Sequence, residues 1–305
     1  NSHTIEEMIM FKYAVNSLAD YVSTVTEIVN EVDDIWFRGH ACASYRLVPS
    51  VLRDTVPLTD ARGNRVENGQ VILSEGGHVT GLSPENMFYE FKSRAVPFLN
   101  REPSNNFEWM FLMQHYGVPT RLLDWTTNAL VALFFAIESN PTSDEERHYN
   151  ESPSQNFMES DEFCSEGAAV FAISPSKLNY LTVSNRSKIY ICEEADKWSH
   201  YFDPMNKEGS CNFLPIAVQS SHIDTRIRSQ SGHFTLHGSN IWALDYYDEL
   251  RKIIHKIFIP YEVIPQMLKD LQALGITESF IYPGLESLSR DIKRSEAFKF
   301  NGEKL

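Results

Sequence analysis

Residues 114–126 read QHYGVPTRLLDWT, a stretch dense in polar and ionisable groups between two apolar segments. Residues 107–116 before it predict a helix that ends at Gly117, because glycine readily takes the left-handed conformation found just after a helix. Residues 128–139 after it are apolar on nearly all sides and predict a buried helix. Ionisable groups between two such helices are drawn toward the interior, where an isolated charge is costly. Segment 114–126 therefore predicts a polar site within the fold.

Arg121 and Asp124 carry two interpretations. They could form a structural ion pair that locks the turn, because burying either charge alone is unfavourable. Alternatively, Arg121 and the N-terminus of the following helix, capped by Thr126 or Thr127, form an anion site, since free N–H groups there favour phosphate. In the second case His115, which titrates near neutrality, is the candidate general acid or base.

The segment 35–38, Ile-Trp-Phe-Arg, predicts a short strand that Gly39 ends. Side chains alternate along a strand, so Trp36 and Arg38 share one face and Phe37 lies on the other. Because Gly39 has no side chain, a ligand could approach the backbone closely beside Arg38. This strand therefore brings a candidate anion-binding arginine to the same polar site.

Further arginines come from two other segments. Arg53 follows a proline turn, and Arg226, Arg228 and Gln230 share one face of an extended segment at residues 226–236. Each of them alone is typical of a surface or salt-bridge residue. Three or four arginines from separate segments would suit a diphosphate better than a single carboxylate. The sequence thus predicts an arginine-rich pocket for a nucleotide or another phosphate-bearing small molecule.

The remaining pattern predicts the fold class. Helices are predicted at 18–32 after a Ser17 cap, from 84, at 261–274 and from 285, and strands at 168–173, 226–236, 252–259 and 279–282. Helices dominate the first half and strands the second, without regular βαβ alternation, which favours an α+β fold. We expect a helix-rich N-terminal half packed on a mixed or antiparallel sheet from the C-terminal half. Residues 1–305 predict one domain with a core at about 30–290, an excursion at 60–81 and an acidic insertion at 139–166.

Composition excludes several classes of protein. The formal net charge of −14 argues against a general nucleic-acid-binding surface, although eight acidic residues and one arginine fall within 139–166, so a local basic pocket is compatible with it. No apolar run reaches the roughly 18 residues that span a bilayer, and no secretion signal is evident. The four cysteines form no CxxC pair, and His233 and His237 are too far apart in an extended segment to share a metal. These features predict a cytoplasmic protein without membrane contact or a metal site.

Several of these motifs together resemble the FRG domain family, which is named for its Phe-Arg-Gly motif. The stretches that carry the resemblance are 36–40, 45–53, 114–126 and on to 136, 226–234 and 282–285. His40 stands where a glutamine is commoner in the family, and Gly284 stands where an aspartate is frequent. The resemblance implies an FRG-type unit over about residues 30–290, and it implies the fold unit more than an activity.

The order of elements is also similar, at the level of the fold, to that of ADP-ribosyltransferases. In that superfamily an arginine or histidine on the first core strand holds NAD, a role that falls to Arg38 here, and a late strand presents a catalytic glutamate. Residues 230–234 followed by 257–260 resemble that late stretch in DNA-modifying ADP-ribosyltransferase toxins. Where their glutamate falls, this chain has Ser, Gly and His at 231–233. Either another carboxylate such as Asp124 serves, or the site binds without transferring.

Three functions follow as alternatives. The first, which the sequence favours, is an enzyme that uses NAD as a transferase or glycohydrolase. The second is a non-catalytic module that senses a nucleotide or anion in a bacterial defence or stress system, and the third makes the arginine–aspartate network purely architectural. The residues predicted for catalysis are His115, Asp124 and Gln230, and those predicted to bind the cofactor are Arg38, Gly39, Arg53, Thr120, Arg121 and Thr126.

Overall fold

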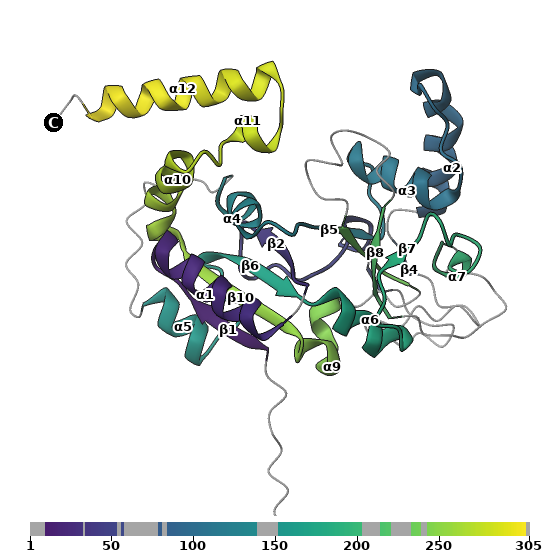
Figure 1. Cartoon of the computed structure of the whole chain (residues 1–305), viewed down its shortest axis with the longest axis horizontal. Coiled ribbons are helices and arrows are strands. Elements are labelled where there is room, and N and C mark those ends of the chain that lie inside the picture. The colour runs from purple at the N-terminus through teal and green to yellow at the C-terminus, as the bar shows by residue number, and fades with distance from the viewer. Residues whose placement is uncertain are drawn as a thin grey trace, which may run out of the picture.

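The computed structural model describes residues 10–32, 34–53, 56–57, 79–80, 84–138, 152–202, 214–220, 233–238 and 243–302. Its helices are α1 (Leu18–Glu31), α2 (Pro84–Ala95), α3 (Asn106–His115), α4 (Ala129–Ile137), α5 (Pro153–Glu159), α6 (Pro175–Val183), α7 (Ser199–Phe202), α9 (Asp248–Arg251), α10 (Ile264–Ala273), α11 (Glu278–Ile281) and α12 (Leu285–Gly302). Its strands are β1 (Phe11–Ala14), β2 (Trp36–His40), β3 (Val56–Pro57), β4 (Val79–Thr80), β5 (Leu122–Trp125), β6 (Gly167–Ile173), β7 (Ile189–Tyr190), β8 (Ile216–Gln219), β9 (His233–Leu236) and β10 (Ile254–Pro260). Two four-stranded sheets lie next to each other among these helices (Figure 1), so the predicted α+β class is confirmed.

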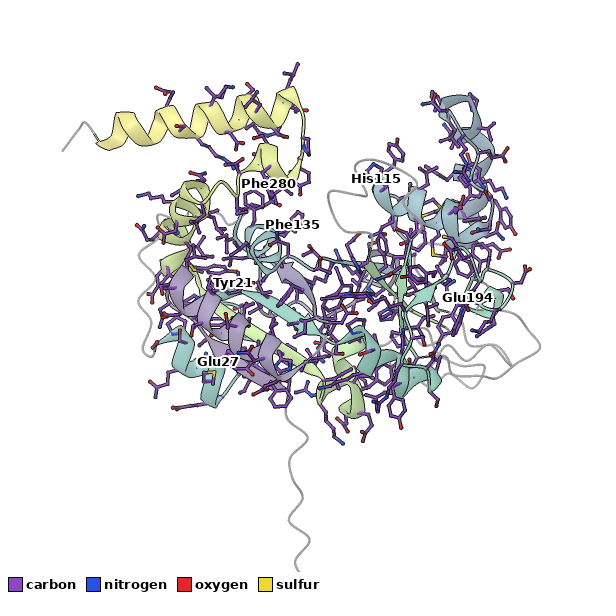
Figure 2. The ribbon with its side chains drawn as sticks, in the orientation of Figure 1. Tyr21, Glu27, His115, Phe135, Glu194 and Phe280 are labelled. Atoms are coloured by element: carbon purple, nitrogen blue, oxygen red, sulfur yellow. The ribbon has the colours of Figure 1, made fainter. Side chains whose placement is uncertain are left out.

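The first sheet has the strand order β1-β10-β6-β2 and is covered on both faces. Its central strands, β6 and β10, pair antiparallel, and every residue in them is buried. One face packs against α1, α4 and α10, and the other packs against α5, α6 and α9. Tyr21 of α1 is fully buried and donates its hydroxyl hydrogen to the Ala129 carbonyl at 2.7 Å, which ties α1 to the start of α4 (Figure 2). A continuous apolar run such as 168–173 suits a strand that is covered on both faces, and that predicted strand is confirmed.

The second sheet has the strand order β5-β9-β8-β7. Helix α3 covers one face, where Phe107 and Phe111 pack with Phe234 of β9. Helix α6 lies against β8, because the Asn179 side chain both donates to the Ala217 carbonyl and accepts from its N–H, at 2.9 and 2.7 Å. Helix α2 packs in turn on α3.

The two sheets meet where β5 ends beside β2. Phe37 and Thr126 exchange two main-chain hydrogen bonds, with N–O distances of 2.7 and 2.8 Å. Helix α4 then crosses over β2 so closely that a Cβ on Gly39 would lie 2.1 Å from the Ala132 carbonyl oxygen. Gly39 is therefore inside β2 rather than at its end, and on its side-chain side a helix, not a ligand, makes the close approach.

Several predicted helix boundaries agree with the structure. Ser17 caps α1 by accepting from the Asp20 N–H at 3.1 Å. Gly117 and Gly275 follow α3 and α10 with positive φ angles of 77° and 83°. These positions favour glycine because other residues are strained there.

Other predicted elements differ. The strand at 279–282 is wrong, because residues 278–281 form helix α11, whose first N–H groups are accepted by the Thr277 hydroxyl and the Asp291 carboxylate. The cap of α4 is Asn128 rather than Thr126 or Thr127, since its side-chain oxygen accepts from two N–H groups of the first turn.

The strands are also not confined to the C-terminal half, because β1, β2 and β5 all come from the first half and join both sheets. The predicted excursion at 60–81 and the arginine-bearing part of 226–236 lie almost wholly outside the described residues, although β3 and β4 pair antiparallel at the two ends of the excursion. Among the helices that the structure describes, none has the length and apolar character to cross a bilayer.

Lys256 of β10 is a fully buried cation on the face of the first sheet that packs against α5, α6 and α9. Its ammonium group donates to the main-chain carbonyls of Ala43 and Glu162 and lies within 6 Å of the ring centres of Phe157, Phe163 and Phe171. Burial lowers the pKa of Lys256 to about 8, since a charge is poorly solvated there.

The free energy of unfolding should therefore rise with pH between about 8 and 10.5. Below pH 8 Lys256 is charged in both the folded and the unfolded chain, whereas between about 8 and 10.5 only the unfolded chain keeps the proton. Compared with Lys256→Met, the wild type should gain roughly 2–3 kcal/mol in unfolding free energy between pH 7.5 and 10, as measured by urea unfolding. The same comparison with Lys252→Met, at an exposed lysine, should show no such gain. Equal pH dependence in the wild type and Lys256→Met would contradict the buried charge.

Candidate functional site

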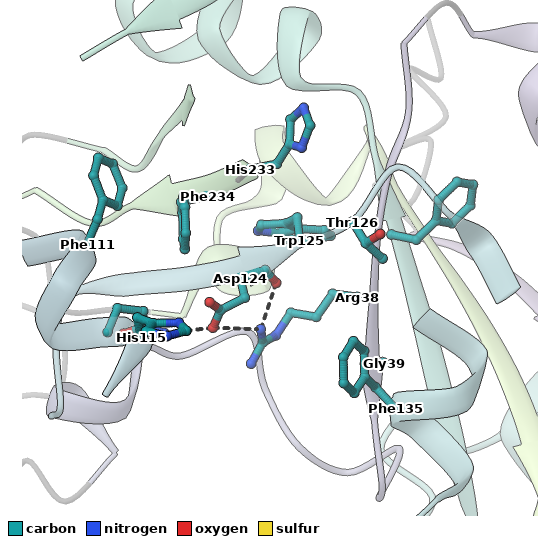
Figure 3. Close-up of a pocket in the computed structure, with 12 residues that line it drawn as sticks. Arg38, Gly39, Phe111, His115, Asp124, Trp125, Thr126, Phe135, His233 and Phe234 are labelled. Carbon is teal, nitrogen blue, oxygen red and sulfur yellow. Dashed lines mark hydrogen bonds and ion pairs between the residues drawn. The ribbon is translucent and has the colours of Figure 1, made fainter. Parts of the chain in front are cut away.

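A cleft of about 370 Å³ lies at the junction of the two sheets. Its walls come from β2, from the end of α3, from β5 and the residues after it, and from α4 and β9. The residues that line it are Phe37, Arg38, Gly39, Phe111, Gln114, His115, Asp124, Trp125, Thr126, Phe135, His233 and Phe234 (Figure 3). The structure thus brings together in one cleft two segments that the sequence analysis links, 36–39 and 114–126.

Arg38 crosses the cleft from the first sheet to the second (Figure 3). Its Nε–H donates to His40 Nε2 at 3.0 Å, and its Nη1 donates to the Asp124 carbonyl oxygen at 2.7 Å and lies 3.8 Å from the Asp124 Oδ2 atom. No described residue accepts from Nη2. Burial lowers the pKa of Arg38, and the Asp124 carboxylate opposes that change. Nε and Nη1 of the guanidinium are therefore anchored, and Nη2 can donate to a ligand.

His40 accepts a hydrogen bond from Arg38 and is not among the residues that line the cleft. Its ring is buried, and its Nδ1 lies 3.2 Å from the Tyr45 carbonyl oxygen. A carbonyl can only accept, so Nδ1 carries the proton and Nε2 is the acceptor for Arg38. Burial holds the pKa of His40 well below its ordinary value, and the positive charge of Arg38 lowers it further. His40 is consequently neutral near pH 7.

Asp124 is held by a second chain of hydrogen bonds. The buried Thr120 hydroxyl donates to Gln114 Oε1 at 2.5 Å, and Gln114 Nε2 donates to Asp124 Oδ2 at 2.6 Å. The Leu122 N–H donates to the same Thr120 oxygen at 3.1 Å, which orients its hydroxyl hydrogen toward Gln114. The Asp124 side chain is 57% exposed, and Oδ1 has no hydrogen-bond donor in the described part of the chain. An oriented carboxylate thus faces the cleft with one oxygen available.

Aromatic rings form the two ends of the cleft. On the side of the second sheet, the rings of Phe111 and Phe234 lie 4.8 Å apart. On the side of α4, Phe135 packs edge-on against Tyr282, with ring centres 6.0 Å apart. His115 and Phe135 lie on α3 and α4, on the facing sides of the junction (Figure 2). The polar centre therefore lies between two apolar ends, and pockets for small molecules commonly combine aromatic walls with a few placed polar groups.

A family model described as the FRG domain matches residues 33–145. The chain contains an FRG domain. The match begins just before β2 and ends beyond α4, so it includes Arg38, Gln114 and Asp124. Searches among curated proteins and among solved structures found no match to the chain.

The FRG domain does not complete the cleft alone, because His233 and Phe234 of β9 line it from outside the matched range. The motifs at 226–234 and 282–285 also lie beyond the match, so a single FRG-type unit over residues 30–290 stays a prediction. His233 packs edge-on against Trp36, with ring centres 4.7 Å apart, which joins β9 to the FRG strand β2.

Arg121 of the FRG domain lies away from the cleft. It is buried, and its guanidinium donates to the main-chain carbonyls of Tyr201, Phe202, His237 and Gly238. The predicted Arg121–Asp124 ion pair is wrong, because the partners of Asp124 are Arg38 and Gln114. Side chains alternate along an extended chain, so positions 121 and 124 project to opposite sides.

The other predicted site residues divide into three groups. Gly39, Thr126, His115 and Asp124 line the cleft with Arg38. Thr120 does not line the cleft and donates to Gln114. Arg53 is exposed, and its Nε donates to the Val48 carbonyl at 3.2 Å. Its positive charge adds to the effect of burial in lowering the pKa of Arg38. Gln230, together with Arg226 and Arg228, lies outside the described residues. Arg38 is thus the one arginine among the described lining residues.

The anion site predicted at the start of α4 lacks both of its proposed parts. Arg121 is turned away, and the N–H groups of Leu130 and Val131 are already accepted by the Asn128 side chain. The Thr126 N–H already donates to the Phe37 carbonyl oxygen, so it is not available to an anion at this turn.

Three features of the cleft lie outside the predictions made from the sequence. Those predictions place Gln114 only within a polar segment and give no role to the aromatic ends at Phe111 and Phe135. They treat His40 only as a departure from the family pattern. Its place two residues after Arg38 on a strand could have indicated contact, because such residues share one face.

Proposed function

We propose that the FRG domain binds NAD in this cleft and breaks its bond between ribose and nicotinamide, so that ADP-ribose passes to water or to an acceptor. The observation that carries the proposal is the pairing of an anchored Arg38 with an oriented Asp124 carboxylate at the centre of a cleft with aromatic ends. No metal is required for the proposed steps, and NAD serves as the substrate.

Binding follows from the shape and charge of the cleft. The free Nη2 edge of Arg38 can donate to a phosphate oxygen, a contact that charged guanidinium groups make strongly. The rings at Phe135 and at Phe111–Phe234 lie on either side of Arg38 (Figure 3), so planar bases joined by a diphosphate would match the order ring, anion, ring. Arg53 adds positive charge near Arg38.

The chemistry assigned to Asp124 is electrostatic. When the bond between ribose C1′ and the nicotinamide nitrogen breaks, its electron pair leaves with neutral nicotinamide and positive charge develops on the ribose. A carboxylate fixed by Gln114 and Arg38 stabilises that charge without first having to reorient. Water or an acceptor group then adds to C1′ and releases a proton, which His115 can take. Gln230 remains a proposed ligand-orienting residue.

Asp124→Asn tests this assignment, because asparagine keeps an oxygen that can accept from Gln114 but removes the negative charge. Nicotinamide release from NAD, measured with purified protein and with lysate as a source of acceptors, should fall about 100- to 1000-fold. Binding of ADP-ribose, measured by calorimetry, should change only a few-fold. Glu90→Gln, at an exposed ion pair on α2, is the matched control and should leave both measurements unchanged.

Two results would count against the enzyme. If the wild type releases no nicotinamide and labels no protein in lysate, the transferase and glycohydrolase activities are excluded for NAD. If Asp124→Asn turns over at the wild-type rate, the carboxylate does not act at the reacting bond.

A second candidate function is a non-catalytic module that senses a nucleotide or another anion, in a defence or stress system. It is favoured by the residues Ser, Gly and His at 231–233, where the ADP-ribosyltransferase toxins that the sequence resembles have a glutamate. This module would show a melting temperature raised by a few degrees with ligand at about 100 times its dissociation constant, and no nicotinamide release. The two assays together therefore separate binding from turnover.

A further inference from the structure

The orientation of Arg38 depends on a residue that does not line the cleft. His40 follows Arg38 by two positions on β2, so both side chains leave the same face of the strand. The hydrogen bond between Arg38 Nε and His40 Nε2, at 3.0 Å, closes this pair. It fixes the guanidinium at its inner end, while the Asp124 carbonyl fixes Nη1.

His40 is itself held in a single orientation. Its ring packs edge-on against Phe171 of β6, with ring centres 5.0 Å apart, and also meets the Tyr45 ring at 6.5 Å. The Nδ1–H bond to the Tyr45 carbonyl fixes the ring about its own axis. The ring is buried and is not among the residues that line the cleft, so these contacts do not depend on a ligand for their formation.

The chemistry of the pair requires a neutral imidazole. Only the neutral ring offers a lone pair at Nε2, and a protonated ring would set two N–H donors and two positive charges against each other. Burial lowers the pKa of His40 most, and the positive charges of Arg38 on the same strand, Arg53 after the Ser50–Leu52 turn and Lys256 on β10 lower it further. His40 therefore remains an acceptor through the neutral pH range.

We propose that His40 is the positioning residue of the cleft: it holds the Arg38 guanidinium in the orientation that presents Nη2 to an anionic ligand. This inference rests on the proposed function for its ligand, and on the structure alone for its geometry. A flexible arginine would have to be ordered on binding, whereas here part of that ordering is complete beforehand. Loss of the contact should therefore weaken binding about tenfold.

Two amide variants separate positioning from packing. In His40→Gln the longer side chain can bring its oxygen to the place of Nε2 and accept from Arg38. In His40→Asn the shorter side chain can bring its nitrogen to the place of Nδ1 and donate to the Tyr45 carbonyl, but it cannot reach Arg38. The positioning role predicts that Gln keeps ADP-ribose affinity within about threefold and that Asn loses about tenfold. The melting temperature of each variant, compared with that of the wild type, checks that it is folded.

A readout without ligand keeps the test independent of the proposed function. The Arg38 Nε–H resonance, assigned by its loss in Arg38→Lys, should exchange slowly with solvent in the wild type and in His40→Gln, and rapidly in His40→Asn. In an Arg38→Ala background, changing His40 to Asn should cause no further loss of affinity. Slow exchange that depends on His40, found with a protein that binds no nucleotide, supports positioning and refutes the proposed function.

The opposite pattern overturns the inference. If His40→Asn keeps both slow exchange and affinity while His40→Gln loses them, the bond to Tyr45 matters and His40 is a packing residue. If both variants behave as the wild type does, Arg38 is oriented by Asp124 alone.

Discussion

Replacement of Gly39 with alanine is expected to lower the unfolding free energy by about 3 kcal/mol or more, a large part of the stability of an ordinary domain. The new methyl group would lie 2.1 Å from the Ala132 carbonyl oxygen and 2.6 Å from the Ala136 nitrogen. Both are backbone atoms of α4, so no side chain can turn aside to make room. Either β2 or α4 must move, and the movement would also shift Arg38. Urea unfolding and ADP-ribose binding measure the two effects.

Two other glycines serve as controls. Gly284 has open space around its α-carbon, so Gly284→Ala should be nearly neutral. Gly117 also has open space but a φ of 77°, so Gly117→Ala should cost about 1 kcal/mol through backbone strain alone. If Gly39→Ala is no more destabilising than Gly117→Ala, the close contact between β2 and α4 does not exist in solution.

This packing explains the glycine of the Phe-Arg-Gly motif better than a ligand does. Phe37 faces the core shared with α1 and α4, Arg38 faces the cleft, and Gly39 lets α4 lie on the strand. Sequence alone indicates the alternation of Phe37 and Arg38, because a period of two is a local property. It does not indicate which backbone approaches Gly39, since that depends on a helix about ninety residues further along the chain.

The same distinction separates the correct from the wrong predictions at residues 114–126. The helix end at Gly117 follows from local backbone preference, and it is confirmed. The strand β5 is only four residues long and has no local pattern strong enough to distinguish it from a turn. It exists because it pairs with β9, residues 233–236, far along the chain. If β5 is taken as a turn, Arg121 and Asp124 are close enough in the sequence for an ion pair to be predicted.

The cleft itself was predictable in outline because its polar residues are clustered in two short segments. Arg38, His115 and Asp124 are ionisable residues next to apolar stretches of the sequence, and such residues need either partners or a function. The spacing of Arg38 and His40 on a strand is compatible with their contact. The chain of hydrogen bonds from Thr120 through Gln114 to Asp124 was not predictable, because it depends on side-chain geometry that spacing does not encode.

Arg121 gives the second large expected effect. Arg121→Met should destabilise the fold by about 3–5 kcal/mol, because it leaves buried carbonyl groups without their donor. The guanidinium donates to four carbonyl groups, two in α7 and two directly after β9. It therefore links α7 to the end of β9, beside β5. Lysine cannot replace this fork, because one ammonium group cannot span both carbonyl pairs. Arg121→Lys should therefore recover only part of the loss in urea unfolding.

The matched control is Arg94→Met, at an arginine whose side chain is 77% exposed in an ion pair with Glu90, where the expected change is below about 0.5 kcal/mol. Nucleotide binding distinguishes the architectural role of Arg121 from the cofactor-binding role that the sequence predicts. Under conditions where Arg121→Met remains folded, its affinity for ADP-ribose should equal that of the wild type, since the side chain points away from the cleft. A folded Arg121→Met that has lost ADP-ribose binding would return Arg121 to the ligand site and would remove the assignment of the anion contact to Arg38 alone.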